Sequence, residues 1–90
     1  MIRKHCFFSG KVQGVFFRAN TRDKAREKDV KGWVKNLKDG RVEAVFEGPR
    51  EDVEDVIEFC RNDQPHARVD DVEIDEEEPT GEFDSFQVRR

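Results

Sequence analysis

The segment from Phe8 to Arg18 constrains this chain more than any other, because it marks where a strand ends and a helix begins. A hydrophobic strand pattern stops at Gly10, the chain passes through a second glycine at Gly14, and Arg18 follows as a helical stretch starts. A loop of this kind can turn several backbone N–H groups toward one point, where an anion can bind. The planar, permanently charged guanidinium of Arg18 suits phosphate oxygens. The segment therefore predicts a strand–loop–helix unit with a small phosphate-binding site.

The composition limits the partners that this chain can have. Its 90 residues predict one domain over 1–90, and 34% hydrophobic residues leave only a modest core. The net charge of −4 argues against a protein that binds the nucleic-acid backbone. No apolar stretch is long enough to span a membrane, and the N-terminus lacks the apolar core of a secretory signal. We expect a cytoplasmic monomer without nucleic-acid or membrane partners.

The cysteines and histidines form no recognisable metal site. Cys6 and Cys60 lie far apart and show no metal-ligand spacing, and His5 and His66 do not complete a cluster with them. We therefore expect no metal and no cofactor. Two buried free thiols suit a cytosolic chain, but a strand and a helix can also bring Cys6 and Cys60 together as a disulfide. The sequence leaves both possibilities open.

Periodicity and turn residues predict the elements. Strands are expected over about 3–9, 32–37, 41–47 and 69–74, helices over about 18–28 and from Pro49 to about 63, and a short C-terminal strand over about 83–88. The Asp39-Gly40 pair between two alternating runs is a strong hairpin signal. The second helix is the clearest element, since its apolar residues repeat at helical spacing and acidic residues fill its other face. Those apolar residues are Val53, Val56, Ile57 and Cys60.

This order of elements predicts an α/β (α+β) fold of the ferredoxin-like βαββαβ type. Two split βαβ halves give a four-stranded antiparallel sheet with two helices on one face. The first strand has apolar residues on both faces, which favours a central, well-covered position. We expect Trp33 and the phenylalanines to be core residues. The acidic run from Asp70 to Glu78 is expected to form a solvated edge strand and turn.

Two motifs at fixed spacing resemble a known family. Residues 10–18 read GKVQGVFFR and meet every fixed position of the pattern G-x-V-Q-G-V-x-F-R. Residues 32–36 read GWVKN and match the pattern glycine, aromatic residue, valine, lysine or arginine, asparagine. The G-x-V that follows is Gly40-Arg41-Val42, and the later glycine is Gly48. Together these motifs resemble the two signatures of the acylphosphatases. The resemblance covers essentially the whole chain, and no position that matters for the chemistry departs from it.

The resemblance implies a metal-independent hydrolase that cleaves the carboxyl–phosphate bond of a small-molecule acyl phosphate. The products are a carboxylate and inorganic phosphate, and the phosphate is also expected to act as a competitive ligand. By the same resemblance, Arg18 binds the phosphoryl group and Asn36 positions the attacking water. The backbone amides of the loop form the phosphate cradle. The cradle residues are Gly14, Val15, Phe16, Phe17 and Arg18.

The chemistry is consistent with these residue types. A carboxylate is already a good leaving group, so phosphoryl transfer demands mainly positioning and charge stabilisation. Neither motif contains an evident general base, so we expect the substrate's own phosphate oxygen to take the proton of the water. Gln13 is expected to hold the loop in shape through side-chain-to-backbone hydrogen bonds, and one aromatic residue near the loop could contact the acyl group.

Two other functions are weighed against the hydrolase. A binding module would keep the cradle for phosphate or carbamoyl phosphate without useful turnover, but intact Arg18 and Asn36 favour catalysis. An RNA- or protein-binding domain would rest on the fold alone, which is a poor guide to function. The acidic balance and the lack of an aromatic–basic signature on the strands argue against RNA.

Overall fold

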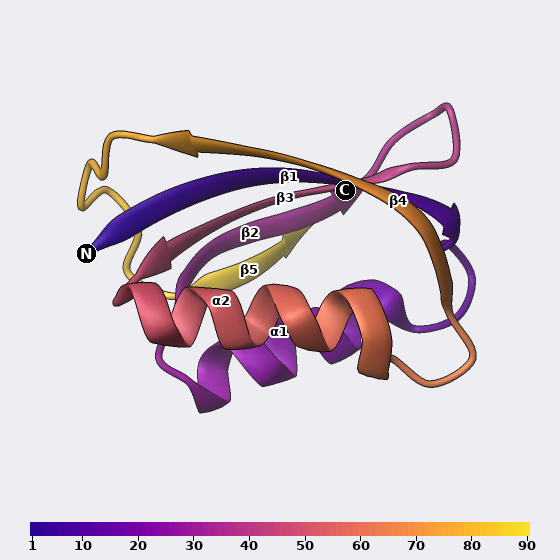
Figure 1. Cartoon of the computed structure of the whole chain (residues 1–90), viewed down its shortest axis with the longest axis horizontal. Helices are drawn as coiled ribbons and strands as arrows, with labels where there is room; N and C mark the ends of the chain where they lie inside the picture. The colour runs from indigo at the N-terminus through magenta and orange to yellow at the C-terminus, as the bar shows by residue number, and fades with distance from the viewer.

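A five-stranded sheet organises the computed structural model, which describes all residues from 1 to 90. Its strands lie in the order β4-β1-β3-β2-β5, and both helices pack against one face (Figure 1). The strands are β1 (Ile2–Lys11), β2 (Lys31–Asn36), β3 (Val42–Gly48), β4 (Arg68–Glu77) and β5 (Phe86–Arg89). The helices are α1 (Phe17–Glu27) and α2 (Arg50–Glu58), the latter continued by the π-helical turn η1 (Phe59–Asp63).

The βαββαβ order is present, but the prediction of a four-stranded antiparallel sheet is wrong. A fifth strand, β5, pairs in parallel with β2, so the sheet is mixed. The N–H of Gly32 donates to the carbonyl of Ser85 at 3.2 Å where this pairing begins. Phe86 is fully buried, and its ring stacks on Phe46 with centroids 5.5 Å apart. Burial of the Phe86 ring stabilises the C-terminal segment. The spacing of apolar residues had predicted only a short strand there.

The predicted hairpin and the predicted second helix are confirmed. The N–H of Leu37 donates to the carbonyl of Arg41 at 2.8 Å, which closes the turn around Asp39-Gly40. The apolar stripe of α2 is buried against the sheet. Pro49 lies just before the first helical residue and leaves the chain extended there, with φ −57° and ψ 140°. Neither helix is long and apolar enough to cross a membrane.

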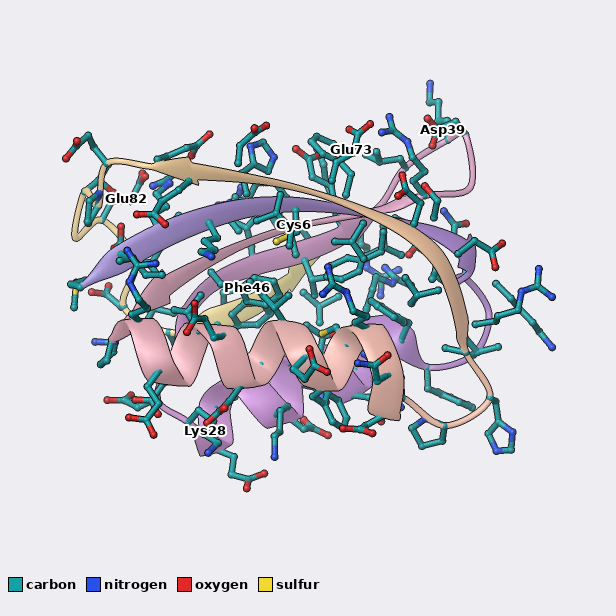
Figure 2. The ribbon with its side chains drawn as sticks, viewed as in Figure 1. Cys6, Lys28, Asp39, Phe46, Glu73 and Glu82 are labelled. Carbon is teal, nitrogen blue, oxygen red and sulfur yellow. The ribbon has the colours of Figure 1, made fainter.

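The core lies between the sheet and the helices. Phe46 and Cys6 extend from the sheet toward the helices, whereas Glu73 lies on the opposite side (Figure 2). Val34 and Ala44 share the inner face with them and are fully buried. Since α1 contributes only Phe17, Thr21 and Ala25 to this layer, small side chains let most of α1 lie close to the sheet.

The prediction that β1 is covered on both faces is wrong. β1 is central, between β4 and β3, but no helix covers the face that carries His5 and Phe7. Polar groups cover that face in part: His5 Nε2 lies 2.6 Å from a carboxylate oxygen of Glu43, and the guanidinium of Arg41 lies 4.8 Å from the centroid of Phe7.

Trp33 is likewise not a core residue. It is half-exposed on the open face, with Lys35 and Arg89 at 5.6 and 4.8 Å from a ring centroid of its indole. The sequence did not predict that Lys35 and Arg89 would lie beside Trp33. The pairing register of β2 with β5 brings Arg89 to this position, and it cannot be inferred from either strand alone. The acidic edge is confirmed: β4 is an edge strand, and most of its residues are exposed.

Candidate functional site

The pairing of three strands brings the two motifs together at one end of the sheet. Phe8 of β1 and Asn36 of β2 both pair with Val42 of β3, from opposite sides. The loop that leaves β1 and the end of β2 therefore lie at the same end (Figure 1). Residues separated widely in sequence are placed side by side because β3 is antiparallel to both of its neighbours.

The loop reaches α1 through a left-handed turn. Gly14 has φ 75°, and Phe16, the residue before the helix, has φ 60° and ψ 21°. A left-handed residue followed by a helical one directs successive N–H groups toward one side, which makes an anion-binding concavity. The backbone of the loop is therefore compatible with the anion site that the sequence predicts, which stays a prediction.

The N-terminus of α1 is left without a cap. Phe16 has no side chain that can accept a hydrogen bond, and the first turn contains no acidic residue. The first backbone bond runs from the N–H of Asn20 to the carbonyl of Phe16 at 2.9 Å, so the amides of Phe17, Arg18 and Ala19 have no intrahelical acceptor. Free N–H groups and the positive end of the helix dipole both favour an anion here.

Phe17 anchors this first turn in the core. Its buried ring lies 5.4 Å from that of Phe8, measured between centroids. Its carbonyl accepts a hydrogen bond at 3.2 Å from Nε2 of Gln64, which also donates to Oγ1 of Thr21 at 2.7 Å. These contacts fix the start of α1 against β1 and η1, so the free amides are held in place before any ligand binds.

Asn36 ends β2 at the same site. Its Oδ1 atom is buried and has no hydrogen-bond partner in the protein. Buried polar atoms are rarely left in this state, so the amide of Asn36 retains an unused acceptor. The neighbouring residue, Leu37, is tied to the loop: Nε2 of Gln13 donates to its carbonyl at 2.8 Å and to that of Arg41 at 3.0 Å.

The predicted hydrogen bonding of Gln13 to the backbone is thus confirmed, with a specific consequence. Its acceptors lie in the β2–β3 hairpin rather than in its own loop. The side chain therefore links the loop that leads to Arg18 with the turn that follows Asn36.

A cleft of about 480 Å³ lies between these elements. Its lining contains three arginines and no acidic side chain, although the chain as a whole has a net charge of −4. Arg18 is held loosely, with Nη1 3.5 Å from the carbonyl of Arg89, while Nε of Arg22 donates to Asp23 at 3.0 Å. The lining residues are Val12, Gly14, Phe16, Phe17, Arg18, Ala19, Arg22, Asn36, Val88 and Arg90.

Most of the predicted site residues meet in this cleft. Gly14, Phe16, Phe17 and Arg18 line it together with Asn36. Val15 does not line it and instead packs its side chain against the core.

Sequence reasoning missed other residues that belong to the cleft. Arg22 follows Arg18 by one helical turn, so helical spacing alone could have found it. Val88 and Arg90 come from the end of the chain. Gln64, directly after η1, does not line the cleft but supports the first turn of α1. No local pattern marks these three, because they reach the site only through tertiary packing.

Comparison with known proteins agrees with this geometry. The sequence profile of the acylphosphatase family matches residues 4–88. The chain belongs to the acylphosphatase family. It is 57% identical to an acylphosphatase of Natronomonas pharaonis over 89 residues, which cover 99% of this chain and 96% of that one.

Solved acylphosphatase structures share the fold. The structure from Bacillus subtilis superposes with a TM-score of 0.94 and 32% identity, and all of both chains is covered. The structure from Coxiella burnetii gives a TM-score of 0.90 and 41% identity, covering 98% of this chain and 92% of that one. The fifth strand and the mixed sheet are therefore consistent with acylphosphatase structures.

Proposed function

We propose that the cleft hydrolyses acyl phosphates, with Arg18 and the amides of α1 binding the phosphoryl group and Asn36 holding the attacking water. The observation that carries the proposal is the uncapped N-terminus of α1, which opens beside Arg18 and Asn36 in a cleft without acidic side chains. The activity is that of the family to which the chain belongs. The roles of Arg18 and Asn36 are those that the resemblance of the two motifs implies, and the meeting of both residues in the cleft supports them.

The phosphoryl oxygens are the group that this site suits best. The free amides of Phe17, Arg18 and Ala19 are fixed donors, and the guanidinium of Arg18 adds a planar fork. Charge accumulates on the equatorial oxygens during phosphoryl transfer, so donors fixed in advance stabilise the transition state without reorganisation. The core packing of Phe17 supplies this rigidity.

Asn36 is the group on the cleft that is suited to a water molecule. Its amide can accept one hydrogen bond and donate another, which fixes both the position and the orientation of the water. The position of Asn36 in the cleft lining supports this role, and no protein group competes for its Oδ1 atom.

The reaction then balances without a protein base. The water oxygen forms a bond to phosphorus, and the bond from phosphorus to the acyl oxygen breaks, with its electron pair leaving on the carboxylate. One proton of the water passes to a phosphate oxygen, because no aspartate, glutamate or histidine lines the cleft. The products are a carboxylate and dihydrogen phosphate.

The test is hydrolysis of benzoyl phosphate in the presence of a chelator by the native chain and by Asn36→Ala. We expect kcat to fall by about 100-fold or more in the variant, while inorganic phosphate inhibits both proteins with similar constants. Asn62→Ala is the matched control, because Asn62 is exposed in η1 and bonds only to Glu58. It should retain the native kcat.

Other outcomes discriminate between the proposals. Phosphate binding without turnover by the native chain would instead support a phosphate-binding module. Equal turnover by the native chain and Asn36→Ala would leave the hydrolase standing and remove Asn36 from it. Loss of turnover in chelator, restored by a divalent cation, would contradict the metal-independent scheme.

The remaining expectations belong to this proposal. We infer that residues 1–90 act as one catalytic unit, as a cytoplasmic monomer, and that inorganic phosphate competes with substrate for the amides of α1. Light scattering at several protein concentrations tests the monomer, and competitive kinetics with phosphate test the shared site.

A further inference from the structure

Phe16 is an aromatic residue that the fold does not use. It is 79% exposed, and it is the only exposed aromatic residue of the chain. It is absent from the core, forms no aromatic or cation–π pair, and yet lines the cleft. Single exposed apolar side chains are common on protein surfaces, but this ring lines the cleft itself and stands on a left-handed backbone position.

The backbone makes this choice of residue more costly. Phe16 adopts the left-handed region, which glycine and asparagine enter with less strain than a bulky residue. Asparagine would also cap α1, since its side chain accepts bonds from the first-turn amides. A ring at this position therefore serves neither the turn nor the helix, and residues held in such conformations cluster at functional sites.

The surroundings of Phe16 indicate what the ring contacts. The cleft volume of about 480 Å³ exceeds what one phosphate group fills, so room remains for the rest of the substrate. Val88, which is partly exposed, adds apolar surface to the lining. Arg18 and Asn36, which the proposed function assigns to the phosphate and the water, lie in the same cleft.

We propose that Phe16, with Val88, forms an acyl-group subsite that favours acyl phosphates with an apolar, preferably aromatic, acyl group. The inference rests on the proposed function and adds its substrate preference. The ring of Phe16 covers one face of the acyl group when the phosphoryl group occupies the amides of α1. An aromatic acyl group stacks on this ring, whereas an acetyl group is too small to cover it.

The test compares kcat/KM for benzoyl phosphate with kcat/KM for acetyl phosphate. In Phe16→Ala this ratio is expected to fall by about 3- to 10-fold, the range typical of one aromatic contact. The ratio is the readout, because any effect of the substitution on the loop or the phosphate site acts on both substrates and cancels. Ile74→Ala, which truncates another exposed apolar side chain on the distant edge strand, should keep the native ratio.

Phe16→Gly separates the ring from the backbone. Glycine relieves the left-handed strain, so an effect of strain would differ between Phe16→Gly and Phe16→Ala, whereas loss of the ring gives the same reduced ratio in both. A ratio unchanged from the native value in both variants would overturn the subsite.

Failure of the proposed function is distinguishable from failure of the subsite. If the native chain hydrolysed neither substrate, calorimetric binding of two stable phosphonate analogues would still decide the subsite. Phenacylphosphonate should then bind more tightly than acetonylphosphonate to the native chain, and equally tightly to Phe16→Ala. Equal affinities in the native chain would overturn the inference.

Discussion

Nε2 of Gln13 lies 2.8 Å from the carbonyl oxygen of Leu37, a bond that joins the β1–α1 loop to the residue directly after Asn36. The same nitrogen lies 3.0 Å from the carbonyl of Arg41, so one side chain bridges the loop and both sides of the β2–β3 turn. The two sequence motifs are therefore connected by a side chain as well as by the sheet.

Gln13→Met keeps the length of this side chain and removes both hydrogen bonds. We expect the free energy of unfolding to fall by about 1–2 kcal/mol, at roughly 1 kcal/mol for each bond. We also expect kcat to fall by about 10-fold, because a small misplacement of catalytic groups is costly. Urea denaturation and benzoyl phosphate kinetics measure the two effects. Gln87→Met is the control, since Gln87 bonds only locally to Ser85. Destabilisation with native kcat would show that the bridge is structural only.

Arg18→Lys keeps the positive charge and removes the planar fork. Loss of one charge-assisted hydrogen bond should weaken phosphate binding by about 10- to 100-fold, measured as the inhibition constant of inorganic phosphate. Arg22→Lys makes the same change in the same cleft, where the proposed function assigns no phosphate contact, and should have a much smaller effect. Equal effects of the two variants would indicate that the cleft uses general positive charge rather than a specific fork.

The two cysteines are expected to be inert in the folded protein. Burial raises the pKa of the Cys6 thiol to about 12 and that of Cys60 to about 11, although the hydroxyl of Thr21 and the amide of Gln64 partly oppose the shift at Cys60. Only the thiolate reacts with Ellman's reagent. At about pH 8 we expect no reaction in the native state and two thiols per chain in urea, because both cysteines are free. A chain with a Cys6–Cys60 disulfide would release none in either state.

The same raised pKa values predict a loss of stability in alkali. The folded state keeps both thiols protonated, whereas the unfolded chain ionises them near their ordinary pKa of 9.0. The free energy of unfolding should therefore fall as the pH rises above about 9. Cys60→Ala should show a smaller decrease over this range in urea titrations, and an equal decrease would contradict the assignment.

Acid should weaken the contact that holds the segment before β5. Hydrogen bonds from Arg3, at 2.7 Å, and from Thr80 lower the pKa of the Glu82 carboxylate below its ordinary value of 4.5. A lowered pKa stabilises the folded state above pH 4.5, and this stabilisation is lost as the pH falls through the lowered value. The urea midpoint of Glu82→Gln should consequently drop less between about pH 6 and pH 3 than that of the native chain. Because the pair is exposed, the difference should shrink in high salt.

Short sequence patterns predicted the helices, strands and turns of this chain, because turn residues and the spacing of apolar residues act over a few neighbouring positions. The Asp39-Gly40 pair satisfies a tight turn, and the spacing of Val53, Val56 and Ile57 creates an apolar face only on a helix. The loop from Gly10 to Arg18 was predicted as an anion site for the same reason, since its glycines and its helix start lie within one short segment. Its position beside Asn36 was implied only by resemblance to the family.

Errors arose where the environment of a residue depends on distant segments. Trp33 was expected in the core. Side chains alternate between the two faces of β2, and because Val34 points to the helices, Trp33 lies on the face that no helix covers. The C-terminal strand was marked by alternating residues, yet its parallel pairing with β2 depends on the edge that β2 leaves open and on the space beside Phe46. Neither property is encoded within a short window of sequence.

The sequence by itself determined the strand, turn and helix boundaries to within a few residues, the family, and the two motifs that carry the proposed chemistry. Only the tertiary structure decided that the sheet has five strands, that Gln13 joins the loop to the hairpin, that Gln64 supports the first turn of α1, and that Phe16 lies exposed at the cleft. The physical reason is one of range: backbone preferences and periodicity act over a few residues, whereas strand pairing and side-chain packing join residues that the chain order keeps far apart.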